Sequence, residues 1–198
     1  GIGYIKNKTY YHTVQNDSMQ VNYVFSFFVN PDKRFFALTS NGLYEWKKNV
    51  WEKRNWIKRF ENMPVRTMVY DSGSLYIAYF NYFVKYYPDG THKILDSNFK
   101  SSPQYLSIKK YGDDIILQQP TSLYRVKGEQ LIPLFQNALK GLFVYTSLKD
   151  SQGRFWVSTE EEGLFVSQRG EEQKFAYKIP LPNNLVSGIY EDKENNVW

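Results

Sequence analysis

The chain of 198 residues contains no cysteine. This absence excludes disulfide bonds, thiolate metal sites and cysteine nucleophiles, and it is compatible with a reducing or an oxidising compartment. There is no apolar run of 18 residues, so we expect no helix of this chain to cross a membrane. The long amphipathic runs that helical repeats require are also missing, apart from fragments such as 134–142, where we expect one helical turn at most.

Residues that carry catalysis are scarce. The two histidines, His12 and His92, lie 80 residues apart, and no H-x-x-x-H or H-E-x-x-H spacing occurs. No G-x-x-x-x-G-K-[ST] or G-x-G-x-x-G string for a phosphate-binding loop is present either. Carboxylates cluster at predicted turns, at 160–162, 171–172 and 191–192, where we expect solvated loops. The sequence therefore predicts no catalytic residue, no metal and no cofactor.

A regular recurrence of bulky side chains is the main feature that the sequence does have. Phe36, Tyr76, Ile116 and Trp156 follow one another at intervals of 40 residues, and Trp198 follows 42 residues later. A second marker comes seven or eight residues after each of the first four, at Leu43-Tyr44, Phe83-Val84, Leu123-Tyr124 and Leu164-Phe165. A period of this size indicates stacked supersecondary units.

Each period has the composition of four short antiparallel strands. A turn signal precedes each marker, and a β-prone run precedes each turn. These runs are 24–29, 65–70, 105–109, 143–148 and 186–190. After the turn, a second strand contains the first marker and a third strand contains the second marker. A further hairpin, for example at Pro88-Asp89-Gly90, leads into the fourth strand. Four strands in about 40 residues form the blade of a β-propeller, and we expect the markers to fill the space between blades.

The predicted fold class is therefore all-β, a β-propeller segment of four-stranded antiparallel blades. We divide the chain into the end of a blade, four complete blades and the start of another, at 1–22, 23–63, 64–102, 103–141, 142–182 and 183–198. The partial blades either pair to close a ring of five or belong to a larger propeller, and we favour the larger, incomplete one. Open blade arrays leave unpaired edges, so we expect association with a second copy, as a homodimer, with the remaining propeller blades of the parent protein, or with another chain.

Positive charge is concentrated in one stretch, 46–60. The formal net charge of the chain is +5, and this stretch holds six Lys and Arg side chains against one glutamate. It also holds Trp46, Trp51 and Trp56. On a single strand, the odd spacing of Trp46 and Trp51 would place their side chains on opposite faces. A hairpin that turns near Lys48-Asn49 would instead bring these two rings together.

Indole rings beside cations suit a sugar that bears sulfate or carboxylate. Single-stranded nucleic acid is the weaker alternative, because the chain carries no recognised motif for it. The residues that we place at this candidate ligand site are Trp46, Trp51, Lys53, Arg54 and Trp56. In the competing interpretation, Trp51 and Trp56 pack between blades while the cations keep an outer strand soluble.

Two strings near the end of the chain resemble the two-component regulator propeller repeat. Residues 145–159, YTSLKDSQGRFWVST, and residues 181–192, LPNNLVSGIYED, follow the pattern L-P-x-N-x-V-x-x-I-x-E-D-x-x-G-x-x-W-[IV]-x-T-x-x-G-L. The first string continues to Gly163-Leu164-Phe165 and the second to Asn196-Val197-Trp198. The earlier copies lack the tryptophan of this pattern, and the last copy lacks its glycine.

The resemblance implies an extracytoplasmic sensor. In that family such propellers form the periplasmic region of inner-membrane hybrid two-component sensors with a histidine kinase, and many members detect oligosaccharides as dimers. By this resemblance the chain is a non-catalytic ligand-sensing or dimer-forming segment, with the membrane helix and kinase outside it and no nucleic acid bound by it. Two alternatives stay open, a sialidase-like glycoside hydrolase, which shares the turn at 150–156, and a protein-interaction scaffold.

Overall fold

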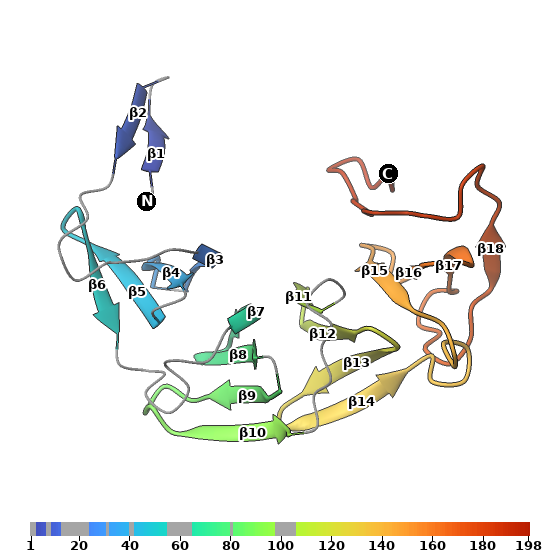
Figure 1. The fold of residues 1–198 in the computed structure, drawn as a ribbon, viewed down its shortest axis with the longest axis horizontal. Coiled ribbons are helices and arrows are strands. Elements are labelled where there is room, and N and C mark those ends of the chain that lie inside the picture. Colours follow the sequence, from blue (N-terminus) through green and yellow to red (C-terminus); the bar gives the residue numbers. More distant parts are fainter. Residues whose placement is uncertain are drawn as a thin grey trace. The chain divides into compact units, whose positions relative to one another are not determined.

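The computed structural model describes residues 3–6, 9–12, 24–30, 32–39, 42–54, 65–79, 81–97 and 106–198. Strands in these ranges form four four-stranded antiparallel sheets and one two-stranded sheet (Figure 1). The chain divides into two compact units, Gly1–Phe99 and Lys100–Trp198. Each four-stranded sheet has the size and the consecutive strand order of a propeller blade, which confirms the predicted fold class.

Helices long and apolar enough to cross a membrane are absent from the described ranges.

The first unit holds the two-stranded sheet and two blades. β1 (Gly3–Lys6) pairs with β2 (Thr9–His12). The first blade comprises β3 (Val24–Val29), β4 (Phe35–Thr39), β5 (Gly42–Lys47) and β6 (Val50–Arg54). The second blade comprises β7 (Val65–Asp71), β8 (Ser74–Tyr79), β9 (Phe83–Tyr86) and β10 (His92–Asp96). Each strand pairs with its neighbour in sequence, because short turns join antiparallel partners.

The second unit holds two further blades. The third blade comprises β11 (Ser107–Tyr111), β12 (Asp114–Gln119), β13 (Ser122–Lys127) and β14 (Gln130–Leu134). The fourth blade comprises β15 (Val144–Lys149), β16 (Phe155–Thr159), β17 (Gly163–Val166) and β18 (Tyr177–Ile179). Between these blades the amide of Leu139 donates to the carbonyl of Phe135 over 2.9 Å, which is the helical turn expected at 134–142.

The run 186–190 forms no strand, contrary to the prediction. Tyr190 and Trp198 exchange main-chain hydrogen bonds of 3.0 and 2.7 Å, and Glu191 bridges Val197, so only the tip of a hairpin is built. A two-stranded hairpin is marginal without a third strand beside it, because it buries little apolar surface. Residues 185–198 are named the C-terminal hairpin.

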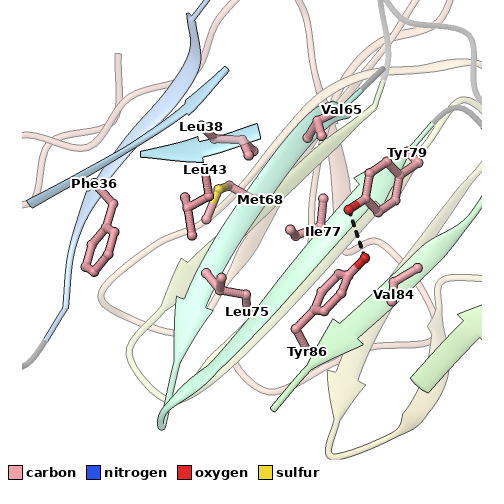
Figure 2. Close-up of a cluster of buried hydrophobic side chains, with 10 residues drawn as sticks. All are labelled: Phe36, Leu38, Leu43, Val65, Met68, Leu75, Ile77, Tyr79, Val84 and Tyr86. Carbon is pink, nitrogen blue, oxygen red and sulfur yellow. Dashed lines mark hydrogen bonds between the residues drawn. The ribbon is translucent and has the colours of Figure 1, made fainter. Parts of the chain in front are cut away.

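The core of the first unit lies between its two blades (Figure 2). Ten buried side chains form it: Phe36, Leu38, Leu43, Val65, Met68, Leu75, Ile77, Tyr79, Val84 and Tyr86. Phe28 extends this core by stacking on Phe36 at 4.8 Å and on Tyr70 of the second blade at 5.6 Å between ring centroids. The hydroxyls of Tyr79 and Tyr86 are 3.1 Å apart, which satisfies both, and burial raises the pKa of Tyr79.

Three of the five periodic markers are core residues, whereas Trp156 is half-buried and Trp198 is exposed. Phe36, Tyr76 and Ile116 are 0, 4 and 2% exposed, as expected for side chains packed within and between blades. Trp156 is only half-buried, and its indole N–H donates to Asp150 over 2.8 Å. This ring therefore holds a turn in place as well as covering the sheet.

Two residues after the marker, a polar side chain joins the third blade to the fourth. The amide of Gln118 donates to the carbonyl of Tyr145 over 3.1 Å, and its carbonyl oxygen accepts from Ser147 Oγ over 2.8 Å. Ser158 occupies the same position in the fourth blade and donates to the main chain of the C-terminal hairpin over 3.0 Å. Buried polar groups on facing sheets therefore set the spacing of these blades.

Replacing Gln118 with alanine should lower the free energy of unfolding by about 2 kcal/mol, because the Ser147 hydroxyl and the Tyr145 carbonyl lose a buried partner. Urea unfolding of the chain measures the change. The double variant Gln118→Leu with Ser147→Ala replaces the pair by apolar groups and should recover part of the loss. A Gln118→Ala variant as stable as the parent would contradict this role.

Candidate functional site

The predicted ligand site lies on the first blade, on the hairpin formed by β5 and β6. Trp46 and Trp51 face each other across this hairpin, with ring centroids 5.1 Å apart. Lys48 and Asn49 form the turn with φ values of 49° and 65°, the left-handed pair that a two-residue type I′ turn requires. The predicted hairpin is confirmed.

Strand alternation divides the predicted residues between the two faces of this sheet. Lys53 shares the face of Trp46 and Trp51, whereas Arg54 pairs with Leu43 on the opposite face. The face of Arg54 is the one packed toward the second blade, because Leu43 belongs to the core shared with that blade. A ligand on the tryptophan face therefore meets Lys53 and not Arg54.

Arg54 is engaged within its own blade. Its guanidinium lies 2.5 Å from a carboxylate oxygen of Glu45 and 3.0 Å from one of Glu52, and Arg34 lies 3.6 Å from Glu45. The Glu45 side chain is 4% exposed, so this desolvated carboxylate depends on its cationic neighbours. Sequence analysis missed Glu45, although its place directly opposite Glu52 required a cation nearby. Trp56, the remaining predicted residue, lies outside the described residues.

An aromatic cluster covers the face of the first blade that carries Trp46. Ring centroids of neighbouring members Phe27, Phe35, Trp46 and Trp51 lie between 5.1 and 6.4 Å apart. Trp51 is 1% exposed and forms the floor of the cluster, whereas Phe35 and Trp46 are half-buried and Phe27 is 47% exposed. These four residues are named the first-blade aromatic face, and the rings that a ligand can reach include those of Trp46 and Phe27.

Exposed lysines border the first-blade aromatic face. Lys47 and Lys48 lie where β5 ends and turns, and Lys53 lies on the face itself. A reachable aromatic ring beside ammonium groups can stack on a sugar ring and attract an acidic substituent. That the region binds a ligand stays a prediction.

A depression of about 500 Å³ lies in the second unit. It is formed by the β11–β12 turn, the β15–β16 turn and the C-terminal hairpin, and it is named the turn depression. Side chains that line it include those of Tyr111, Asp113, Asp114, Lys149, Ser151 and Glu191. Sequence analysis missed this depression, because its walls come from three successive repeats.

Asp150 builds the β15–β16 turn. Its carboxylate accepts hydrogen bonds from the Arg154 amide at 2.8 Å, from Arg154 Nε at 2.7 Å and from Trp156 Nε1 at 2.8 Å. Burial raises the pKa of Asp150, but the hydrogen bonds from Trp156 and Arg154 outweigh burial and hold the pKa below its usual value. Asp192 repeats the arrangement in the C-terminal hairpin, where Trp198 Nε1 donates over 2.7 Å.

The residue before each of these turns reaches back to the turn of the preceding blade. Lys149 forms an ion pair with Asp114 of the third blade. Glu191 accepts from Ser151 of the fourth blade, from the amide over 2.8 Å and from Oγ over 2.6 Å. These two interactions are named the seam contacts. All four residues line the turn depression, so anything held there lies against the junctions between blades.

Glu172 departs from the expectation of a solvated carboxylate. It forms a two-pronged ion pair with Arg125, with one hydrogen bond of 2.8 Å, and Arg125 Nε lies 2.8 Å from Asp114. Arg125 lies on β13, and its planar guanidinium has donors on both sides. It therefore connects Asp114, at the start of β12, with Glu172, in the segment that follows β17. Asp114 and Glu172 are therefore already neutralised within the second unit.

The described side chains offer no metal centre. Within the described ranges no group of three or more His, Asp or Glu residues could hold a metal ion. The His92 ring packs 5.6 Å from the ring of Tyr86 across the β9–β10 hairpin. His12 lies on β2, and its side chain is outside the described part of the chain.

The sequence profile of the two component regulator propeller family matches residues 138–161. These residues contain β15, the Asp150 turn and β16, so the match confirms the resemblance where the motif is most complete. No curated protein matches the chain.

Several solved structures share the fold. The extracellular domain of a protein described as a hybrid two-component system of B. thetaiotaomicron superposes with a TM-score of 0.71 at 17% identity, over 98% of this chain and 29% of that one. PorZ, a surface component of the type-IX secretion system of Porphyromonas gingivalis, gives 0.69 at 8% identity, over 97% and 33%. A catalytically inactive virginiamycin B lyase of Staphylococcus aureus gives 0.63 at 12%, over 93% and 65%. At these identities the likeness shows the fold alone, and the chain spans about a third of the extracellular domain that it matches.

Proposed function

We propose that this chain, which carries a two-component regulator propeller repeat at 138–161, is a ligand-sensing segment of the extracytoplasmic region of a hybrid two-component sensor. The observation that carries the proposal is this repeat, in a blade whose turn from Asp150 to Trp156 is held by hydrogen bonds to the Asp150 carboxylate. The histidine kinase and the membrane anchor belong to other parts of the parent protein, and the segment faces the periplasm.

Three arginines of the described chain are held in ion pairs within their own units. Sialidase-like hydrolysis uses a tyrosine nucleophile, and we expect it to need arginines that converge on a ligand carboxylate. Arg54, Arg125 and Arg154 are each bound to carboxylates of their own unit. The hydrolase alternative therefore lacks support from these three side chains.

We propose that the first-blade aromatic face binds an acidic oligosaccharide. Trp46 and Phe27 offer reachable rings, and Lys48 and Lys53 offer ammonium groups beside them. Binding can signal only if the ligand prefers one arrangement of the receptor over another. In a homodimeric sensor, that preference would shift the placement of one subunit against its partner.

The C-terminal hairpin supports a proposal about assembly. Leu185, Tyr190 and Trp198 are 51, 65 and 75% exposed, which is unusual for apolar side chains of this size on one short segment. We propose that a further blade of the parent protein covers them, because each repeat of a propeller buries its faces against its neighbours.

Charge removal tests the first-blade site. The variant Lys48→Gln with Lys53→Gln should weaken binding of trigalacturonate and of a sulfated chondroitin tetrasaccharide about tenfold, because two ammonium partners are lost. Isothermal titration on the whole extracytoplasmic region measures the affinity at constant salt. Lys127→Gln is a control for the loss of a surface charge away from this site, since Lys127 ends β13 in the third blade. Equal affinity of the double variant and the parent would contradict the proposal that the first-blade aromatic face binds these saccharides.

The sensor role is tested on the full parent protein in membrane vesicles. Saccharides that bind the extracytoplasmic region should change the rate of autophosphorylation, and the Lys48→Gln, Lys53→Gln variant should blunt the response to the acidic ones. A kinase that ignores every saccharide that binds would contradict the proposal.

A further inference from the structure

A small hollow lies in the third blade, beside the β12–β13 turn. Its volume is about 140 Å³, and its lining includes Thr121 and Ser122 at this turn and Gln136 and Leu139 of the helical turn that follows β14. We infer that this hollow, named the Leu139 hollow, binds a neutral ligand that has one aromatic ring and a hydroxyl group, a phenol. This goes beyond the proposed function, because it concerns another ligand class at another place.

The Leu139 hollow marks a difference between the third and fourth repeats. In the fourth repeat, Asn184 Nδ2 donates to the carbonyl of Glu161 over 2.9 Å, and a Cβ on Gly163 would lie 3.1 Å from Asn184 Oδ1. Leu139 occupies the place of Asn184, because each follows by five residues the outer-strand residue that pairs with the second marker. The third repeat therefore has an apolar corner where the fourth has a hydrogen-bonded one.

The floor of the Leu139 hollow is apolar. Leu123, Leu134 and Leu139 form it and are at most 1% exposed, and no side chain of the lining carries a charge at neutral pH. A sugar ring has hydroxyl groups around its edge, and leucine side chains cannot replace the water that these groups would lose. An aromatic ring loses no hydrogen bond on such a floor and buries its apolar surface. The lining therefore favours an aromatic ring over a saccharide.

The size of the Leu139 hollow selects a single ring. Its volume of about 140 Å³ is below the range of about 300 to 1,000 Å³ that is usual for drug-sized ligands. It is close to the roughly 150 Å³ of an engineered cavity, lined by leucine, isoleucine and phenylalanine, that binds benzene. One six-membered aromatic ring therefore fits, whereas a disaccharide does not.

Two polar groups of the lining suit a hydroxyl group on that ring. The Tyr124 hydroxyl and the Gln136 amide have no hydrogen-bond partner among the described residues. The Tyr124 hydroxyl can donate, and the Gln136 carbonyl oxygen can accept. A phenolic hydroxyl does both, so it can bond to these two side chains while its ring lies on the leucines.

The wall that carries Gln136 and Leu139 is held in place at Phe135. The Phe135 amide donates to the carbonyl of Glu172 over 2.7 Å, and its ring stacks on Phe175 at 4.5 Å between centroids. Its φ value of 53° is unfavourable for a bulky side chain and persists only where the surroundings fix it. The Leu139 hollow is therefore formed before a ligand arrives, as small-molecule sites usually are.

The test is direct binding of two probes to the extracytoplasmic region of the parent protein. 4-Fluorophenol has the ring and the hydroxyl group, and fluorobenzene has the ring alone. Each is titrated to about 10 mM and followed by fluorine NMR, and 4-fluorophenol should bind with a dissociation constant of about 1 mM. Fluorobenzene should bind about fivefold more weakly, because it makes neither hydrogen bond.

Three variants locate the site and test the recognition of the hydroxyl group. Leu139→Asn introduces the residue of the fourth repeat and should weaken binding of both probes about tenfold, because the floor becomes polar. Tyr124→Phe with Gln136→Ala should abolish the preference for 4-fluorophenol, since the ring still fits. Asn137→Ala, at an exposed residue of the same helical turn outside the lining, should leave both affinities within about twofold.

Three results would overturn the inference: no binding of 4-fluorophenol at about 10 mM, unchanged affinity in Leu139→Asn, or a preference for 4-fluorophenol that survives in the double variant. Leu139 is buried, so its replacement can also unfold the blade. The double variant guards against this outcome, because Tyr124 is half-buried and Gln136 is exposed, and neither change removes a hydrogen bond among the described residues.

Discussion

Replacing Asp150 with alanine is expected to lower the free energy of unfolding by about 3 kcal/mol. The Asp150 side chain is 0% exposed and accepts three hydrogen bonds, so its removal leaves the Arg154 amide and Trp156 Nε1 without their acceptor. It also leaves the Arg154 guanidinium, held over the Trp156 ring, without its counter-charge. Urea unfolding of the chain measures the loss.

Asp192→Ala is the matched control. Asp192 accepts the same kind of bond from Trp198 Nε1, but its hairpin is exposed, so water can replace the lost acceptor and the loss should be much smaller. Acid provides a second check, because the pKa of Asp150 is depressed in the folded chain. Its contribution is present above the ordinary pKa of an aspartate and is lost as pH falls through the depressed value. Equal effects of the two alanine variants would contradict this account of the turn.

Replacing Trp51 with alanine is expected to cost about 4 kcal/mol, the usual range for removing a buried aromatic side chain. Trp51 is 1% exposed and contacts the rings of Phe27, Phe35 and Trp46, so its loss leaves a cavity beneath the first-blade aromatic face. Thermal or urea unfolding, followed by the circular dichroism of the sheets, measures the cost.

Trp51→Phe separates ring packing from the indole N–H. This nitrogen is buried and has no hydrogen-bond partner among the described residues, so phenylalanine keeps most of the contacts and loses no bond. The phenylalanine variant should therefore be far more stable than the alanine variant. Weakened saccharide binding by Trp51→Ala would not identify a ligand contact, whereas Trp46→Ala, at a half-buried ring, is the informative change. An alanine variant at position 51 with unchanged stability would show that the ring is not part of the core.

Local chemistry made the blades predictable. Lys48 and Asn49 both have the left-handed φ values of a two-residue turn, so the hairpin that joins Trp46 to Trp51 could be expected from a few neighbouring residues. The 40-residue period likewise repeats a local pattern, and the strands of all four blades lie where the period places them. The strand expected at 186–190 did not form, because a strand also requires a partner that local sequence does not supply.

The sites were harder to predict, because they depend on which face of a strand a residue occupies and on contacts between repeats. Lys53 and Arg54 are adjacent in sequence, yet only Lys53 lies on the tryptophan face, while Arg54 pairs with the buried Glu45. Asp113 and Glu191 belong to different repeats, and no spacing within one repeat indicates that they line one depression. Periodicity predicts where a repeat begins but not which charges meet at its border.

The seam contacts make the order of the repeats matter. Lys149 meets a carboxylate on the turn before it, whereas Glu191 meets the amide and hydroxyl of a serine. If the fourth repeat were deleted and the C-terminal hairpin joined to the third, Glu191 would face Asp114 and two carboxylates would meet. Duplication or exchange of repeats in such an array is therefore limited by the residues that meet at each border between repeats. A blade moved to another position would have to be moved together with the turn that its border residue contacts.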